Sequence, residues 1–315
     1  MRSSTRTKSQ TSFYLSLCLI WIPGILTNLL ALFFIIRDIK KAVFPAIILL
    51  LVLCTCDFIA VCFSITRHMV IRYVTDVNYP MCASLATFHS HFKLFSGVMN
   101  VLMAVDRVLA ICFAFYYKQH VSVKTWKLAC LLATVSVAAL NLLPLIGLGS
   151  YTGTRKSTGK MYCTSLSFKA PPIERVYGMA YGFAGIICVI MIVCLNAVVI
   201  RSVLKLSSRV VSYVPSESAT SSTGDTNSSK VNQASVEVAF AKLMLALATV
   251  YLVCETPYNV LILLQQFRVP VDVKITSYVH LISGFSYTVD PVVYILIRKT
   301  NRKRIVDFLC RRKDS

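Results

Sequence analysis

Two carboxylates that interrupt long apolar stretches are the first residues of this chain whose type suggests chemistry. Asp57 and Asp290 each lie inside such a stretch, and the hydroxyls of Ser96 and Ser286 are similarly placed. Ionisable groups in apolar surroundings are costly and mark functional sites. Two carboxylates and two hydroxyls in a dry interior require a cation or protons, so these residues predict a sodium or proton site. A water-filled cluster of structural hydrogen bonds is the alternative.

Lys93 and Glu255 are ionisable residues of opposite charge inside two other apolar stretches. At a helical rise of about 1.5 Å per residue, Lys93 lies roughly 21 Å from Arg107 and Glu255 roughly 27 Å from Glu237. If Arg107 and Glu237 are level, a Lys stem can span the remaining difference of about 6 Å. We predict a buried Lys93–Glu255 ion pair, the alternative being that each charge finds water or a polar neighbour separately.

A second charged pair is expected where two apolar stretches meet the same membrane face. Asp106 and Arg107 close one stretch, and Glu237 begins another. These residues predict a reversible ion pair between Arg107 and Glu237. Two end charges that snorkel separately to the membrane surface are the alternative.

We expect all of these residues to lie on membrane-spanning helices. The chain has 315 residues, of which 56% are hydrophobic and only 15% charged, and its formal net charge is +20. Apolar stretches of roughly 20 residues separated by short basic clusters are typical of an integral membrane protein. We predict an all-α membrane protein, a bundle of seven transmembrane helices within 13–297, with spans at Phe13–Ile36, Val43–Ile65, Phe88–Phe113, Trp126–Gly149, Val176–Ile200, Leu243–Gln265 and Ile275–Ile297.

The distribution of Lys and Arg predicts an extracellular N-terminus. With that orientation the inner side holds 20 basic residues and the outer side 12, as the positive-inside rule requires. Residues 1–12 then form an extracellular tail, and the Ser- and Thr-rich segment 206–235 forms a flexible intracellular loop. Residues 298–315 are expected to form a short amphipathic eighth helix and a cytoplasmic tail. Cys310 is a candidate for lipidation there, with a plain free thiol as the alternative.

Two cysteines fall on the outer, oxidising side. Cys82 opens the third span and Cys163 lies in the second outer loop, so a disulfide between them is expected. The chain shows neither a Ser/His/Asp arrangement nor His/Cys metal spacing nor a Gly-rich phosphate loop. We therefore predict that it is not an enzyme, needs no cofactor or metal other than an allosteric Na⁺, and does not bind nucleic acid.

Short motifs occur along the chain in a fixed order. Seven spans with these motifs resemble a rhodopsin-like, class A G-protein-coupled receptor over essentially the whole chain. The residues that carry the resemblance are Asn28, Asp57, Cys82 at 25 residues before Arg107, the triplet Asp106-Arg107-Val108, Cys254-Glu-Thr-Pro257 and Asp290-Pro-Val-Val-Tyr294.

Within that family the chain looks most like the prostanoid receptors of the prostaglandin E type. The similar segments are Asp290-Pro-Val-Val-Tyr-Ile-Leu-Ile-Arg-Lys299, Leu143-Pro-Leu-Ile-Gly-Leu-Gly149 and Phe113-Ala-Phe-Tyr-Tyr117. One departure concerns the ligand, because Leu281 stands where the family has the Arg that pairs with the prostanoid carboxylate.

The resemblance implies a plasma-membrane receptor that activates heterotrimeric G proteins. An extracellular ligand would favour the state in which helix six has moved away from helix three. Lys93, Glu255, Asp106, Arg107, Glu237 and Tyr294 would then form the switch, with the Lys93–Glu255 pair as a latch.

The basic outer surface predicts an anionic ligand, and the resemblance implies that this ligand is a lipid similar to a prostanoid. Arg67 is expected to replace the missing Arg as the carboxylate partner, or else to snorkel to headgroups. The other predicted ligand contacts are His89, Lys93, Tyr162, Thr164 and His280. A divergent chemosensory or peptide receptor is the alternative within the class, and a small proton-coupled transporter is the alternative outside it.

Overall fold

The computed structural model describes residues 20–40, 45–74, 78–154, 161–163, 172–212 and 224–297. The side chains of 205–240 lie outside the description. Within the described part, seven helices are long and apolar enough to cross a membrane. They are α2 (Ile22–Ile39), α3 (Pro45–Tyr73), α4 (Tyr79–Cys112), α6 (Val123–Asn141), α7 (Val176–Ser212), α8 (Gly224–Gln266) and α9 (Val273–Ile297).

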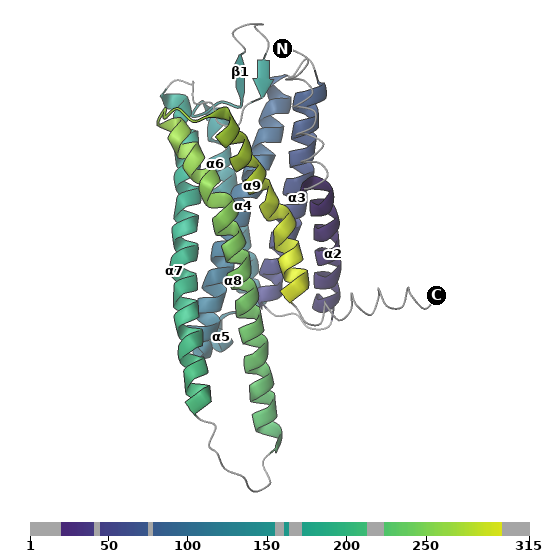
Figure 1. The fold of residues 1–315 in the computed structure, drawn as a ribbon, viewed down its shortest axis with the longest axis vertical. Helices are drawn as coiled ribbons and strands as arrows, with labels where there is room; N and C mark the ends of the chain where they lie inside the picture. The colour runs from purple at the N-terminus through teal and green to yellow at the C-terminus, as the bar shows by residue number, and fades with distance from the viewer. Residues whose placement is uncertain are drawn as a thin grey trace, which may run out of the picture.

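The long helices form a closed bundle (Figure 1). Around it, α2 packs on α3, α3 on α4, α4 on α7, α7 on α8, α8 on α9, and α9 returns to α2. Helix α6 lies outside this ring against α3 and α4. The seven-helix fold predicted from the sequence is therefore confirmed, and α4 is the helix that contacts most of the others.

Short elements cap the bundle at its two ends. A two-stranded antiparallel hairpin pairs β1 (Thr152–Thr154) with β2 (Met161–Cys163), with Thr152 opposite Cys163. We call the end of the bundle that carries it the hairpin end. At the opposite end, the Arg107 end, α5 (Ala114–His120) follows α4, and α7 and α8 extend past the other helices (Figure 1).

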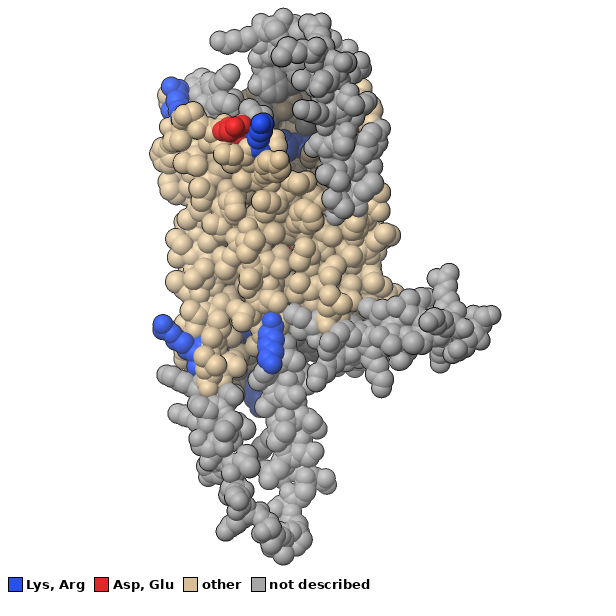
Figure 2. Space-filling model, viewed as in Figure 1, with Lys and Arg blue, Asp and Glu red and all other residues tan. Residues whose placement is uncertain are grey.

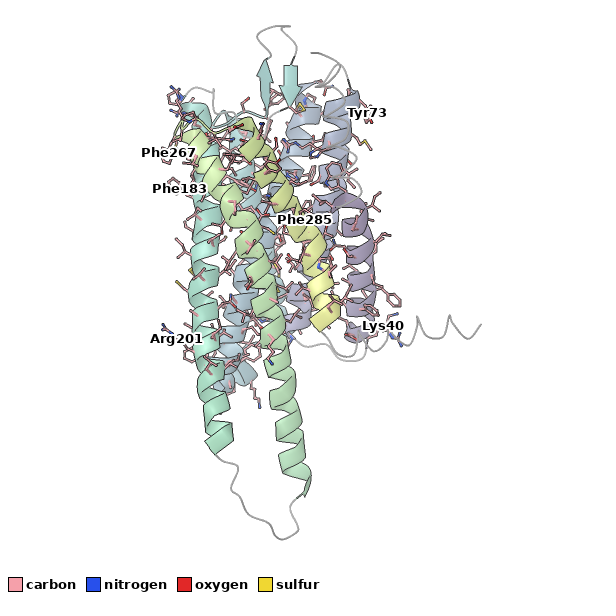
Figure 3. The ribbon with its side chains drawn as sticks, in the orientation of Figure 1. Lys40, Tyr73, Phe183, Arg201, Phe267 and Phe285 are labelled. Carbon is pink, nitrogen blue, oxygen red and sulfur yellow. A yellow bond between two sulfur atoms is a disulfide. The ribbon has the colours of Figure 1, made fainter. Side chains whose placement is uncertain are left out.

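Among the described residues on the face seen in Figure 2, charged side chains lie near the two ends, with an uncharged band between them. Figure 3 shows where single residues lie along the bundle. Lys40 and Arg201 lie near the Arg107 end, and Tyr73 and Phe267 lie near the hairpin end. Phe183 of α7 points away from the bundle and is about half exposed. Apolar helices of 18 residues or more, as found here, have the length that a bilayer core requires.

Several predicted boundaries were wrong by more than a turn. Helix α4 begins at Tyr79, nine residues before the predicted start, because the Asn78 side chain accepts a hydrogen bond from the Met81 amide at 3.1 Å and Pro80 occupies the first turn. Both are favoured at a helix start. Helix α3 continues to Tyr73 instead of ending at Ile65.

The fourth span also differs from the prediction, which was a single helix to Gly149. Helix α6 ends at Asn141 and is followed by a 3₁₀ turn, η2 (Leu143–Ile146). Pro144 lacks the amide proton that a continuing α-helix needs. Gly147 then takes a positive φ of 87°, a conformation that glycine adopts without strain.

The predicted flexible loop 206–235 is wrong at both of its ends. Residues 206–212 continue α7, and residues 224–235 begin α8. Extending a formed helix costs little compared with starting one, so α7 and α8 continue past their apolar stretches. Four predicted segments lie outside the described residues: the middle of the predicted loop, the tail 1–12, the first residues of the first span, and the amphipathic helix 298–315 with Cys310.

A proline within α9 matters for packing. Pro291 of α9 cannot donate to the Tyr287 carbonyl one turn earlier. The Asn28 side chain of α2 donates to that carbonyl instead, at 2.7 Å, and also to the Gly24 carbonyl at 2.8 Å. Asn28 thereby joins α2 to α9 at the break.

Helices α7 and α8 approach each other closely towards the hairpin end. A Cβ atom at Gly185 would lie 2.1 Å from Oδ1 of Asn259, and one at Gly182 would lie 2.7 Å from a methyl carbon of Leu263. Such contacts are possible only without a side chain, as is typical of closely packed membrane helices. This part of α8 is therefore held against α7.

Candidate functional site

The predicted ion pair between helices α4 and α8 is present in the structure. Nζ of Lys93 lies 3.1 Å from Oε2 of Glu255. The two side chains are only 7% and 5% exposed. Charges buried this deeply are tolerated when each has a partner of opposite sign.

Helix α9 completes the surroundings of this pair. The Ser283 hydroxyl accepts a hydrogen bond from Lys93 and donates one to Oε1 of Glu255 at 2.9 Å. The Ser286 hydroxyl lies 3.3 Å from the same Oε1 and 2.9 Å from the Ser283 carbonyl. Three helices thus meet at one carboxylate. Sequence reasoning missed Ser283 because it cannot give the rotation of α9 relative to α4.

An aromatic side chain covers the ammonium group of Lys93. Its Nζ lies 3.6 Å from the ring centroid of Tyr258, a cation–π contact. The Tyr258 ring also makes an edge contact with His280, at 5.3 Å between centroids. Tyr258 was not predicted, although it lies three residues after Glu255 and so shares its helix face.

Arg67 of α3 lies near the same cluster. It is within electrostatic range of Lys93, Tyr258, His89 and His280. The structure therefore brings together the four predicted basic ligand residues, at the hairpin side of the ion pair. Arg67 and Lys93 thus place two cationic side chains beside the Glu255 carboxylate in this cluster.

The predicted sodium or proton site is only partly assembled as expected. The Ser96 hydroxyl donates to Oδ1 of Asp57 at 3.0 Å, and Asp57 and Asp290 are buried within electrostatic range of each other. Among the described residues, Oδ2 of Asp57 and Oδ1 of Asp290 have no hydrogen-bond donor. Ser286, predicted to join them, hydrogen-bonds at Glu255 instead.

At the Arg107 end, the arginine pairs with its own neighbour. Nε of Arg107 donates to Oδ2 of Asp106 at 3.0 Å, and a second guanidinium nitrogen donates to the same oxygen. The phenol of Tyr117 in α5 donates to Oδ1 of Asp106 at 2.7 Å. Burial, followed by the charge of Asp106, raises the pKa of Tyr117. The Glu237 side chain, the predicted partner of Arg107, lies outside the described residues.

A disulfide joins the hairpin to the start of α4. Cys82 is bonded to Cys163 of β2, with 5.1 Å between the Cα atoms.

The sequence profile of the 7 transmembrane receptor (rhodopsin family) matches residues 4–294. This chain belongs to the rhodopsin family of seven-transmembrane receptors. A search of curated proteins gives no match.

The remaining predicted residues of this receptor divide into two groups. Tyr294 is fully buried on α9. The Tyr162 side chain and all of Thr164 lie outside the described residues. Leu281, which stands at the expected Arg position, packs beside a buried apolar cluster that includes Trp21 and Val61. The predicted basic ligand residues therefore gather around Arg67 and Lys93.

Proposed function

We propose that this receptor binds an anionic lipid similar to a prostanoid and activates a heterotrimeric G protein at the Arg107 end. In this proposal the N-terminus and the hairpin end are extracellular and the protein resides in the plasma membrane. The observation that carries the proposal is the gathering of two cationic side chains, Arg67 and Lys93, beside the buried Glu255 carboxylate.

A ligand carboxylate suits this cluster because both Arg67 and Lys93 are cations that attract it. Arg67 offers the forked guanidinium that carboxylates prefer. Lys93 offers an ammonium group that already interacts with Glu255, Ser283 and Tyr258. An incoming anion would compete with Glu255 for Lys93 and weaken the contact between α4 and α8.

The change at the ion pair would be passed along α8. This helix is held against α7 by the glycine contacts at Gly182 and Gly185 and contains Pro257 next to the pair. Prolines in helices are common sites of kinking. We infer that α8 pivots in this region, so that its far end moves away from α4 and leaves Arg107 accessible to a G protein. The ligand drives this change only by its differential affinity for the two states.

We also propose that Asp57 and Asp290 share a Na⁺ ion or a proton. The support is chemical: the two buried carboxylates have oxygens without a donor among the described residues, and Ser96 adds a hydroxyl oxygen. Oxygen ligands of this kind suit a hard cation. Like charges in such proximity are stable only with a cation or proton between them.

The experiment is ligand-stimulated nucleotide exchange on purified G proteins, with the receptor reconstituted in lipid and tested against a panel of eicosanoid acids. At least one acid is expected to stimulate exchange by the wild type. Arg67→Gln should reduce that potency by about 10-fold or more, since charge-assisted hydrogen bonds contribute about 1.5–3 kcal/mol. Arg268→Gln, an exposed substitution at the hairpin end, serves as the matched control and should respond as the wild type does. Equal potency for Arg67→Gln and wild type would eliminate Arg67 as the carboxylate partner.

A further inference from the structure

An open apolar groove of about 630 Å³ runs along the outside of the bundle between α8 and α9. On α8 it is lined by Lys242, Leu245, Ala246, Thr249, Val250, Val253 and Cys254, and on α9 by Val289 and Val293. The α8 residues recur at intervals of three and four, so they form one continuous stripe along the helix. This groove is separate from the Lys93–Glu255 cluster, which lies inside the bundle.

The groove faces the bilayer. Val253 is 63% exposed although it lies within the candidate span Ala241–Gln266. Helices α8 and α9 lie side by side (Figure 1). In the same view, Figure 2 shows a described surface that is uncharged through its middle, with basic side chains near its lower edge. All the lining residues except Lys242 are therefore expected to face the hydrocarbon of the bilayer.

The length of the groove corresponds to one leaflet. From Lys242 to Cys254 the rise along α8 is about 18 Å. One leaflet of a bilayer core measures about 15 Å, half of the full ~30 Å. An acyl chain that begins at the level of Lys242 can follow the groove to its far end.

Charge identifies the headgroup that belongs to this groove. Lys242 is exposed and directly precedes the apolar stretch Leu243–Gln265, which places its ammonium group at headgroup depth. No carboxylate is among the residues that line the groove. A Lys near the membrane surface attracts anionic lipids. We propose that the groove binds one anionic phospholipid, with its headgroup on Lys242 and one acyl chain between α8 and α9.

The first test measures lipid retention and is independent of any ligand or G protein. The full-length receptor is purified in detergent containing equal amounts of phosphatidylglycerol and phosphatidylcholine and examined by native mass spectrometry. The wild type should retain phosphatidylglycerol in preference to phosphatidylcholine. Lys242→Gln should lower this preference about fivefold, the equivalent of about 1 kcal/mol per Lys at a membrane surface. Lys127→Gln, which removes an exposed base of α6 near the Arg107 end, should leave it unchanged.

The second test blocks the path of the acyl chain. Val250→Phe fills the groove and should reduce phosphatidylglycerol retention, whereas Val198→Phe, a matched change on the outward surface of α7, should not. Wild-type retention in both Lys242→Gln and Val250→Phe would overturn the proposal, as would a retained molecule whose mass is that of a sterol or of detergent alone.

The third test requires no substitution and so does not depend on how variants fold. Phosphatidylglycerol with a photoreactive acyl chain is added to the wild-type receptor, irradiated, and the labelled peptides are sequenced. Labelling should concentrate on 242–254 of α8 and on 289–293 of α9. Labelling spread evenly over the outward faces of all seven spanning helices would contradict a specific site.

Discussion

Removing one partner of the Lys93–Glu255 ion pair is expected to destabilise the receptor strongly, and removing both is expected to recover most of the loss. At a separation of 3.1 Å, the attraction of two unit charges is about 5 kcal/mol at an effective dielectric constant near 20. Deleting one partner of a buried pair costs about 3–5 kcal/mol, because the other charge is left unpaired. Lys93→Met and Glu255→Leu test this directly.

The magnitude can be expressed as a change in melting temperature. At about 2 °C per kcal/mol for a chain of this size, each single variant should melt about 6–10 °C below the wild type. The double variant leaves neither charge unpaired, and it should melt within about 3 °C of the wild type. Purified receptors in detergent are compared at one fixed heating rate, because unfolding of such proteins is commonly irreversible.

A control shows whether the two charges stabilise each other or whether any two substitutions destabilise the receptor in the same way. Asp272 is an exposed carboxylate in the segment before α9. Asp272→Leu combined with Lys93→Met should give the sum of the two single effects, as expected for separate sites. If Lys93→Met with Glu255→Leu is likewise additive, the two charges do not stabilise each other and the proposed latch is refuted.

Three further predictions concern other parts of the receptor. Replacing KCl by NaCl should raise the melting temperature by about 3 °C at a Na⁺ concentration ten times the dissociation constant. Asp57→Asn should abolish this difference. An equal rise in that variant would argue against a cation at Asp57. Tyr117→Phe removes a hydrogen bond to a buried carboxylate and should lower the melting temperature by about 3–6 °C, whereas the exposed Tyr116→Phe should change it little. Gly185→Ala should reduce the yield of folded receptor, because its methyl group would overlap an α8 side chain. Gly284→Ala, whose methyl group meets only ordinary contacts at 3.6 Å, should be tolerated, and equal yields of the two variants would contradict the close packing of α7 on α8.

The spans could be predicted because their hydrophobic length is a local property of the sequence. The ends could not, since they depend on single residues such as Asn78, which caps α4, and Pro144, which ends the regular part of the fourth span. Helices α3 and α8 also continue beyond their apolar cores, where hydropathy carries no further signal.

The buried ion pair could be predicted because depth along two helices follows from residue counts. The rotation of each helix about its own axis does not follow from residue counts, and this explains the errors within the site. Ser286 was expected beside Asp57 but hydrogen-bonds at Glu255. Ser283 and Tyr258 contact Lys93 from α9 and α8, and neither was expected.

In the proposed mechanism, the negative charge of a lipid ligand, recognised by Arg67 and Lys93, activates the receptor. The most direct measurement compares an activating eicosanoid acid with its methyl ester, which has the same chain but no charge. Nucleotide exchange on a purified G protein is recorded for both at matched concentrations. The acid should stimulate exchange and the ester should be at least about 10-fold less potent, since the ester cannot make charge-assisted hydrogen bonds. Equal potency of acid and ester would contradict the account.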